Sequence, residues 1–210
     1  GAGDEASFNL FRKLVEDWAI PVCSYWAVEL ALATDHPCHI GASPSPWIEE
    51  ADVIVILDSL APWQPDAHKP RADATIINIG PDPVFSRFPV RNFRSDLSIA
   101  GENSETLPAL IAAMDRRERN LKALEKRRSM LAEASAASRK KTREDAAVRN
   151  AQGITKAWAS KCLGDALRGK KSSVFSELGT ILGVLDRTER NSWFQEPHSG
   201  GLGWSFPCAM

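Results

Sequence analysis

Two runs of β-branched residues constrain the fold of this 210-residue chain more than any other feature. Residues 51–58 read Ala-Asp-Val-Ile-Val-Ile-Leu-Asp, and residues 74–80 read Ala-Thr-Ile-Ile-Asn-Ile-Gly. Neither run alternates apolar with polar side chains, as a strand with one solvated face does. Such runs are typical of parallel strands that other elements cover on both faces. The chain is therefore expected to contain a parallel sheet.

The segments around these runs extend the sheet and add helices. Residues 20–25 and 97–101 are weaker strand candidates. Residues 6–19 and 104–114 carry apolar side chains at helical spacing, so each predicts an amphipathic helix. Strands that alternate with helices or long crossovers indicate an α/β layer. We therefore expect residues 1–114 to form a Rossmann-like domain with a mostly parallel sheet.

Residues 115–152 differ in character. Within 115–150, twelve Lys or Arg stand against six Asp or Glu, and large apolar residues are few among many alanines. A nucleic-acid arm would fit the basic charge, but no aromatic residues interleave with it. The favoured interpretation is a charged, solvated helical linker.

From residue 153 onward the sequence is again typical of a globular domain. Thr155 is a candidate N-cap for a helix, and residues 172–177 predict a strand that ends in a turn at 178–180. The helix is expected to place four side chains along one side: Trp158, Cys162, Leu163 and Leu167. A Gly-rich segment at 199–207 leads into the last residues, where a helix is expected to begin. We therefore expect residues 153–210 to be the N-terminal part of a second, incomplete α/β domain.

Charge and cysteine content restrict the compartment and the partners. The formal net charge is −1, which gives no overall attraction to nucleic acid or to an anionic membrane. The apolar runs are too short for a membrane helix, which needs roughly 20 residues. Four well-separated cysteines without a C-x-x-C pair favour reduced thiols in a cytoplasmic protein. His36, Cys38 and His39 lack the spacing of a zinc site, so no metal is expected there.

Short segments in the first half of the chain (residues 1–114) and in the second half (residues 153–210) carry a resemblance to one enzyme family. In the first half they are Asp35-His36-Pro37, residues 50–59, Pro62-Trp63, His68-Lys69-Pro70 and residues 77–83. In the second half they are residues 154–167, 174–180 and 201–207. In this order they resemble the thiamine-diphosphate enzymes related to acetolactate synthase, which include benzoylformate decarboxylase and the 2-hydroxyacyl-CoA lyases. The resemblance implies a central domain at 1–114 and the start of a diphosphate-binding domain at 153–210.

The resemblance also implies two groups of cofactor-binding residues. In the second half, it places Glu177, Gly179 and Thr180 beside the diphosphate, and Gly201, Leu202 and Gly203 in a turn whose bulky residue supports the bent cofactor. Gly turns with exposed N–H groups suit an anion. In the first half, the ends of the predicted strands would hold FAD or an ADP-type nucleotide in some relatives. The residues at those ends are Asp58, Ser59, Trp63 and Asp82.

For each group there is also a purely structural interpretation. The turn at 178–180 can be an ordinary strand-to-helix connection, Leu202 can be a packing residue, and the site in the first half can be vestigial. The loop at 39–43 is shorter than in flavin-binding relatives, which argues against a bound flavin. Ser205 stands where the family usually has Gly.

The expected function follows from the resemblance. The parent would be a thiamine-diphosphate- and Mg²⁺-dependent carboligase, decarboxylase or lyase acting on a 2-oxo acid or a 2-hydroxyacyl compound. The pyrimidine-binding domain with its activating glutamate, and the Gly-Asp-Gly…Asn-Asn metal motif, have no counterpart in these 210 residues. The chain alone is therefore expected to be inactive, and to need that domain or a partner subunit, in a homo-oligomer. The alternative is a non-catalytic remnant or subunit that binds a partner or an adenine nucleotide through its first half.

Overall fold

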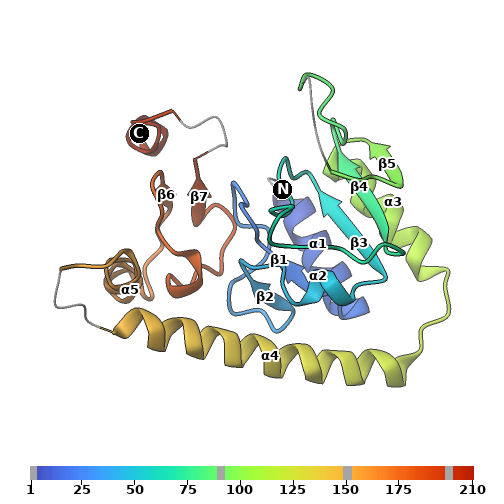
Figure 1. Ribbon diagram of the computed structural model, residues 1–210, viewed down its shortest axis with the longest axis horizontal. Coiled ribbons are helices and arrows are strands. Elements are labelled where there is room, and N and C mark those ends of the chain that lie inside the picture. Colours follow the sequence, from blue (N-terminus) through green and yellow to red (C-terminus); the bar gives the residue numbers. More distant parts are fainter. Residues whose placement is uncertain (1–3, 89–92, 149–152, 197–200) are drawn as a thin grey trace.

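The structure is a mixed α/β fold with short parallel sheets (Figure 1). This computed structural model describes residues 4–88, 93–148, 153–196 and 201–210. In chain order the elements are α1 (Glu5–Trp18), β1 (Val22–Cys23), β2 (His39–Gly41), α2 (Trp47–Glu50), β3 (Val53–Leu57), β4 (Thr75–Gly80), β5 (Leu97–Ala100), α3 (Asn103–Asp115), α4 (Leu121–Ala147), α5 (Lys156–Leu167), β6 (Val174–Ser176), the 3₁₀ helix η1 (Leu182–Val184), β7 (Trp193–Gln195) and α6 (Ser205–Ala209). Every sheet pairing between these strands is parallel, as the sequence predicts.

The two β-branched runs are the neighbouring strands β3 and β4, and β5 completes the three-stranded sheet. One face of β3 and β4 is covered by Ile48 and Trp63, which pack with Ile56 and Ile76. The expectation that both faces are covered is wrong for part of this sheet, although Ile79 on the second face is buried. Val53, Val55, Leu97 and Ile99 are all exposed. The physical reason is the connection from β3 to β4, which is a loop without a helix to lie over that face.

Helix α1 forms where the sequence predicts it. The Asp4 carboxylate caps the helix by accepting a hydrogen bond of 2.9 Å from the Ser7 N–H. On its inner side, Val15 and Ala19 are fully buried in a cluster with Leu32, Cys38, Leu124 and Leu131. The first core of the molecule therefore combines α1, the 30–38 segment and α4.

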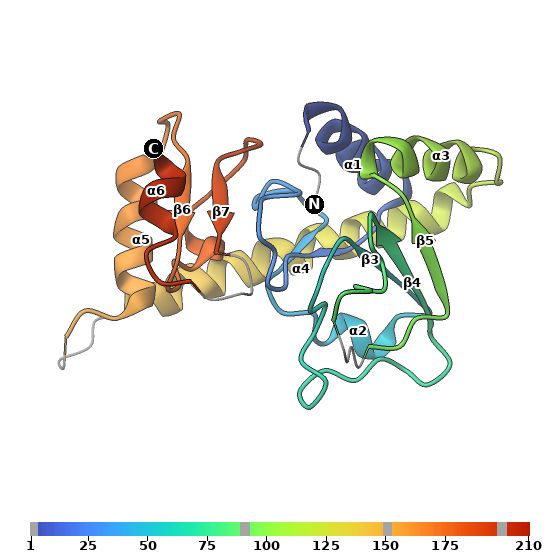
Figure 2. The ribbon, with the colours of Figure 1, turned by 90° about the horizontal axis from the view of Figure 1, so that it is seen from above.

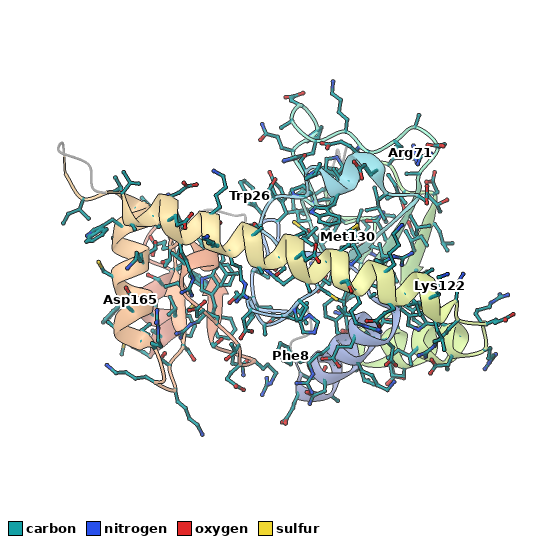
Figure 3. All side chains as sticks on the ribbon, turned by 90° about the horizontal axis from the view of Figure 1, so that it is seen from below. Phe8, Trp26, Arg71, Lys122, Met130 and Asp165 are labelled. Carbon is teal, nitrogen blue, oxygen red and sulfur yellow. The ribbon has the colours of Figure 1, made fainter. Side chains whose placement is uncertain are left out.

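Helix α4 is a 27-residue rod that runs along both halves of the molecule (Figures 1 and 2). Figure 3 shows the outer side of the rod, on which Lys122 and Met130 are exposed. The helix prediction for this segment is confirmed, and most of its surface is exposed. The interpretation as a solvated linker is wrong for the opposite side, where Leu124, Leu131, Ser135 and Ala146 are buried. That side packs because the helix contacts β2, α5 and η1 along its length.

The second half begins with α5, and its Thr155 cap is confirmed. The Thr155 hydroxyl accepts a 3.1 Å hydrogen bond from the Trp158 N–H. The expected apolar side of this helix is wrong, because Cys162 and Leu163 are exposed. Ser160 and Gly164 are the buried positions instead. Their small side chains let α5 lie directly against the backbone of the 181–185 segment.

A segment of the first half completes the second core. The Gln195 N–H donates to the Val28 carbonyl at 2.8 Å, and the Leu30 N–H donates to the Trp193 carbonyl at 3.2 Å. Leu30 is buried with Val174, Leu182, Leu185 and Trp193. Residues 28–34 therefore lie in the first half of the sequence and pack against the second half of the structure. Within the described ranges, no helix combines the length and the apolar character that crossing a membrane requires.

Candidate functional site

A cavity of about 980 Å³ lies between the two halves. Its first wall comes from β2, from the residues between β2 and the start of α2, and from Ser138, Arg139 and Thr142 of α4. Its second wall comes from the turn at 177–183 and from Trp193, Gln195 and Glu196. A cavity of this size can hold a molecule as large as a cofactor or a drug. We therefore take it as the candidate binding site.

The Glu177 carboxylate connects the turn after β6 to the C-terminal turn. It accepts hydrogen bonds from the Gly203 N–H at 2.6 Å and from the Ser205 N–H at 3.1 Å. The Ser205 hydroxyl donates a third bond of 3.0 Å. These bonds, first those from the two backbone N–H groups, lower the pKa of Glu177. Two segments that the sequence analysis singled out separately are thus in direct contact.

The turn at Gly179 lies beside a lysine side chain. Gly179 has φ +114°, and the side chain of Lys156 fills the space that a Cβ at this position would occupy. The Thr180 N–H donates to the Ser176 hydroxyl at 2.9 Å, and the Ile181 N–H donates to the Ser160 hydroxyl at 3.0 Å. These two N–H groups are therefore engaged, and the Lys156 ammonium is the positive group next to the turn. Lys156 escaped the sequence analysis because only the fold brings it to Gly179.

The other residues of the Gly-rich segment are more open. Leu202 is 82% exposed and is not part of the cavity wall. No atom lies within 4 Å of a Cβ built at Gly201 or at Gly203. In this arrangement Leu202 makes neither a core contact nor a contact with the cavity.

The residues proposed at the strand ends of the first half lie apart from the cavity. Trp63 is buried in the core, where its ring meets Phe93 edge-on at 5.3 Å between centroids. The Asp82 carboxylate accepts hydrogen bonds from the N–H and the hydroxyl of Ser86 at 2.8 and 3.0 Å. Asp58 follows β3 with φ +49°, adjoining Gly80. Ser59 is the next residue in the chain, and none of these four residues is part of the cavity wall.

A buried histidine faces the cavity from the first half. His39 is 3% exposed, and its Nε2 lies 3.0 Å from the Ser24 hydroxyl. Burial, assisted by the nearby charges of His36 and Arg139, lowers the pKa of His39 to about 4. The imidazole is therefore neutral at pH 7. It can exchange hydrogen bonds with a ligand without contributing charge.

The described residues fit one part of thiamine diphosphate and do not fit its metal. The Lys156 ammonium beside the turn at Gly179 suits a diphosphate. Among the residues with described positions, no group of three or more His, Cys, Asp or Glu side chains is placed to hold a metal ion. The described part of the chain therefore offers no Mg²⁺ site of that kind. Residues 199 and 200 of the Gly-rich segment lie outside the described residues.

No protein-family model matches the sequence, and no curated protein matches it significantly.

Proposed function

We propose that this chain is part of a thiamine-diphosphate-dependent enzyme that makes or breaks a carbon–carbon bond next to a carbonyl. The substrate would be a 2-oxo acid or a 2-hydroxyacyl compound. The single observation that carries the proposal is the contact between Glu177 and the 203–205 turn. The two segments that resemble the diphosphate-binding domain are far apart in sequence, and a shared site requires them to be neighbours.

The finer architecture belongs to the same proposal. Residues 1–114 would be a Rossmann-like central domain, and residues 153–210 would be the first part of a diphosphate-binding domain. Lys156 and the turn at Gly179 and Thr180 would hold the diphosphate. When bound, thiamine diphosphate supplies the carbanion chemistry of this enzyme class. A pyrimidine-binding domain or a partner subunit would contribute the activating glutamate and complete the site in a homo-oligomer.

Binding of the cofactor's diphosphate to the 210-residue chain tests the proposal. Equilibrium dialysis with Mg²⁺ would compare thiamine diphosphate with thiamine, which lacks the phosphates. We expect thiamine diphosphate to bind at least about tenfold more tightly, a difference of roughly 1.4 kcal/mol. Lys156→Gln should remove most of this preference. Lys170→Gln, a change at another exposed lysine of the second half, should leave it intact.

Two results would contradict the proposal. One is equal binding of thiamine and thiamine diphosphate to the unmodified chain. The other is a preference for the diphosphate that survives in Lys156→Gln. Turnover of a 2-oxo acid by the chain alone, with cofactor and Mg²⁺, would contradict the expectation that the chain needs a partner.

A non-catalytic binding subunit is the second candidate. The observation that favours it is the cavity, which lies between the two halves and is large enough for a small molecule. An adenine nucleotide at the strand ends is less favoured. There the Trp63 side chain is buried in the core, and the Asp82 carboxylate is hydrogen-bonded within its own turn.

A further inference from the structure

The segment that joins α3 to α4, together with the first two turns of α4, is strongly basic. Residues 116–128 contain seven Lys or Arg and two Glu. The whole chain has a formal net charge of −1, so the residues outside this segment carry a net negative charge. Positive charge is therefore concentrated at the N-terminal end of α4, which lies at the right in Figure 1. We call residues 116–128 the basic corner.

Most cations of the basic corner are not neutralised by the chain itself. Arg119 pairs with Asp115. Arg128 pairs with Glu125 at 2.9 Å. Glu118 is the remaining carboxylate of the corner. Five exposed cations form no ion pair with any described residue: Arg116, Arg117, Lys122, Lys126 and Arg127.

The packing of α4 holds its part of the basic corner on the outside of the molecule. Leu124 and Leu131 fix one side of the helix in the core beside Val15. Lys122 and Lys126 each lie two residues from Leu124, so the 3.6-residue turn places them on the opposite side of the helix. Figure 3 shows Lys122 on this outer side. The folded chain thus presents these charges outward from a fixed position.

Large apolar side chains are exposed next to the cations. Leu121, which precedes Lys122 at the start of α4, is 72% exposed, and Met130 is 49% exposed. Cations beside exposed apolar side chains are typical of surfaces that enter the headgroup region of a membrane. Residues 116–128 contain no aromatic side chain on which a nucleic-acid base could stack. The combination favours a lipid surface over a nucleic acid.

We propose that the basic corner binds the surface of a bilayer that contains anionic phospholipids. The unpaired cations would contact the lipid headgroups, and Leu121 would insert among them. Each Lys or Arg near an anionic surface strengthens binding by about fivefold. Screening limits the attraction to a Debye length of about 10 Å at 0.1 M salt, so the acidic remainder of the chain does not cancel it. The corner contributes no residue to the cavity wall, so this proposal is independent of the cofactor.

The test uses the 210-residue chain and lipid vesicles. Cosedimentation at about 0.1 M salt would compare vesicles of phosphatidylcholine alone with vesicles that also contain phosphatidylserine. We expect binding to the anionic vesicles to be tighter by about tenfold or more. Most of this difference should disappear at about 1 M salt, where the Debye length falls to about 3 Å.

Two double variants of α4 separate a local effect from one of net charge. Lys122→Gln with Lys126→Gln should weaken binding to the anionic vesicles by about tenfold or more. The matched control is Lys140→Gln with Lys141→Gln at the other end of the helix, where both lysines are paired with carboxylates of α4. It removes the same two charges and should change binding by less than about twofold. All four lysines are exposed, and thermal unfolding checks that both variants are folded.

Leu121→Ser tests the apolar contribution. It should weaken binding to the anionic vesicles by about threefold or more, while the salt dependence stays the same because no charge is removed. Leu202→Ser, at another exposed leucine far along the chain, is the control and should bind like the unmodified chain.

Three results would overturn the proposal. The first is equal binding to vesicles with and without phosphatidylserine. The second is an equal loss of binding in the two double variants, which would mean that net charge and not the basic corner is responsible. The third is a chain that ignores the vesicles but binds an RNA or DNA oligonucleotide through Lys122 and Lys126. None of these results bears on the diphosphate preference tested with Lys156→Gln, so the two proposals fail separately.

Discussion

At the residue scale, the cavity is bordered by a histidine whose position determines its charge. His39 begins β2, and its carbonyl accepts a 2.9 Å hydrogen bond from the Ser135 hydroxyl of α4. Its ring is enclosed on the other side by Ser24. Burial is the main cause of its lowered pKa, with smaller contributions of the same sign from His36 and Arg139 and an opposing one from Asp35. The folded state therefore stabilises the neutral form of the His39 imidazole.

The lowered pKa of His39 predicts that the free energy of unfolding decreases at mildly acidic pH. The pKa of His39 drops from 6.5 to about 4 on folding, so the unfolded chain binds the extra proton between these values. The stabilising contribution is complete above about pH 6.5 and is lost as the pH falls toward 4. Between pH 7.5 and pH 5 the free energy of unfolding should decrease by about 2 kcal/mol from this group.

Urea unfolding of the unmodified chain and of His39→Gln at both pH values measures the effect. His39→Gln should show a smaller decrease than the unmodified chain. His68→Gln, a change in the loop between β3 and β4 that lies outside the cavity wall, is the control and should show the full decrease. If the free energy of unfolding of the unmodified chain is equal at pH 7.5 and pH 5, the pKa of His39 is not lowered by folding.

At the element scale, local patterns determined the helices and strands better than they determined the buried faces. Thr155 predicts the start of α5 because a cap acts within three residues, and Asp4 caps α1 over the same span. The buried side of α4 depends on Leu124 and Leu131 meeting Val15, more than 100 residues away, and no local pattern carries that information. The same limit on local patterns applies to the candidate site. The family resemblance points to Glu177 and Gly179, whereas Lys156, Arg139 and Trp193 reach the site only through long-range packing.

Helix α5 gives a test of such packing. Gly→Ala within a helix normally stabilises by about 1 kcal/mol. At Gly164 the new Cβ would lie 2.5 Å from the Val184 carbonyl oxygen and 3.1 Å from the Leu185 Cα. Because backbone atoms cannot yield as a flexible side chain does, Gly164→Ala should instead destabilise the chain by roughly 1–3 kcal/mol.

Chemical denaturation of Gly164→Ala and Gly183→Ala checks this reversal of sign. Gly183 is the control because a Cβ there would meet only the Thr142 methyl group, at 3.4 Å. Its substitution should change the free energy of unfolding much less. A Gly164→Ala chain that is more stable than the unmodified one would show that α5 does not pack closely on this segment.

At the scale of the whole molecule, the two halves share their interior. Helix α4 packs on β2 in the first half and on α5 and η1 in the second. The segment at 28–34 leaves the first half to pair with β7 and with the loop before it. The junction is polar as well as apolar. The Thr34 hydroxyl donates to the Arg187 carbonyl at 3.1 Å and accepts from the Arg187 N–H at 3.0 Å. The cavity lies between the halves, so its shape depends on this junction.

Thr34→Val keeps the shape of the side chain and removes both of those hydrogen bonds. Thr34 and Arg187 are both buried, so the Arg187 N–H would lose its partner where water cannot replace it. We expect a loss of about 1–3 kcal/mol in the free energy of unfolding. Because the halves share a core, hydrogen exchange should accelerate both around Leu32 and around Leu185. The control is Thr142→Val, whose hydroxyl bonds only within its own helix, to the Ser138 carbonyl at 2.9 Å. Acceleration confined to one half would mean that the halves open independently and that the cavity between them is not held by this junction.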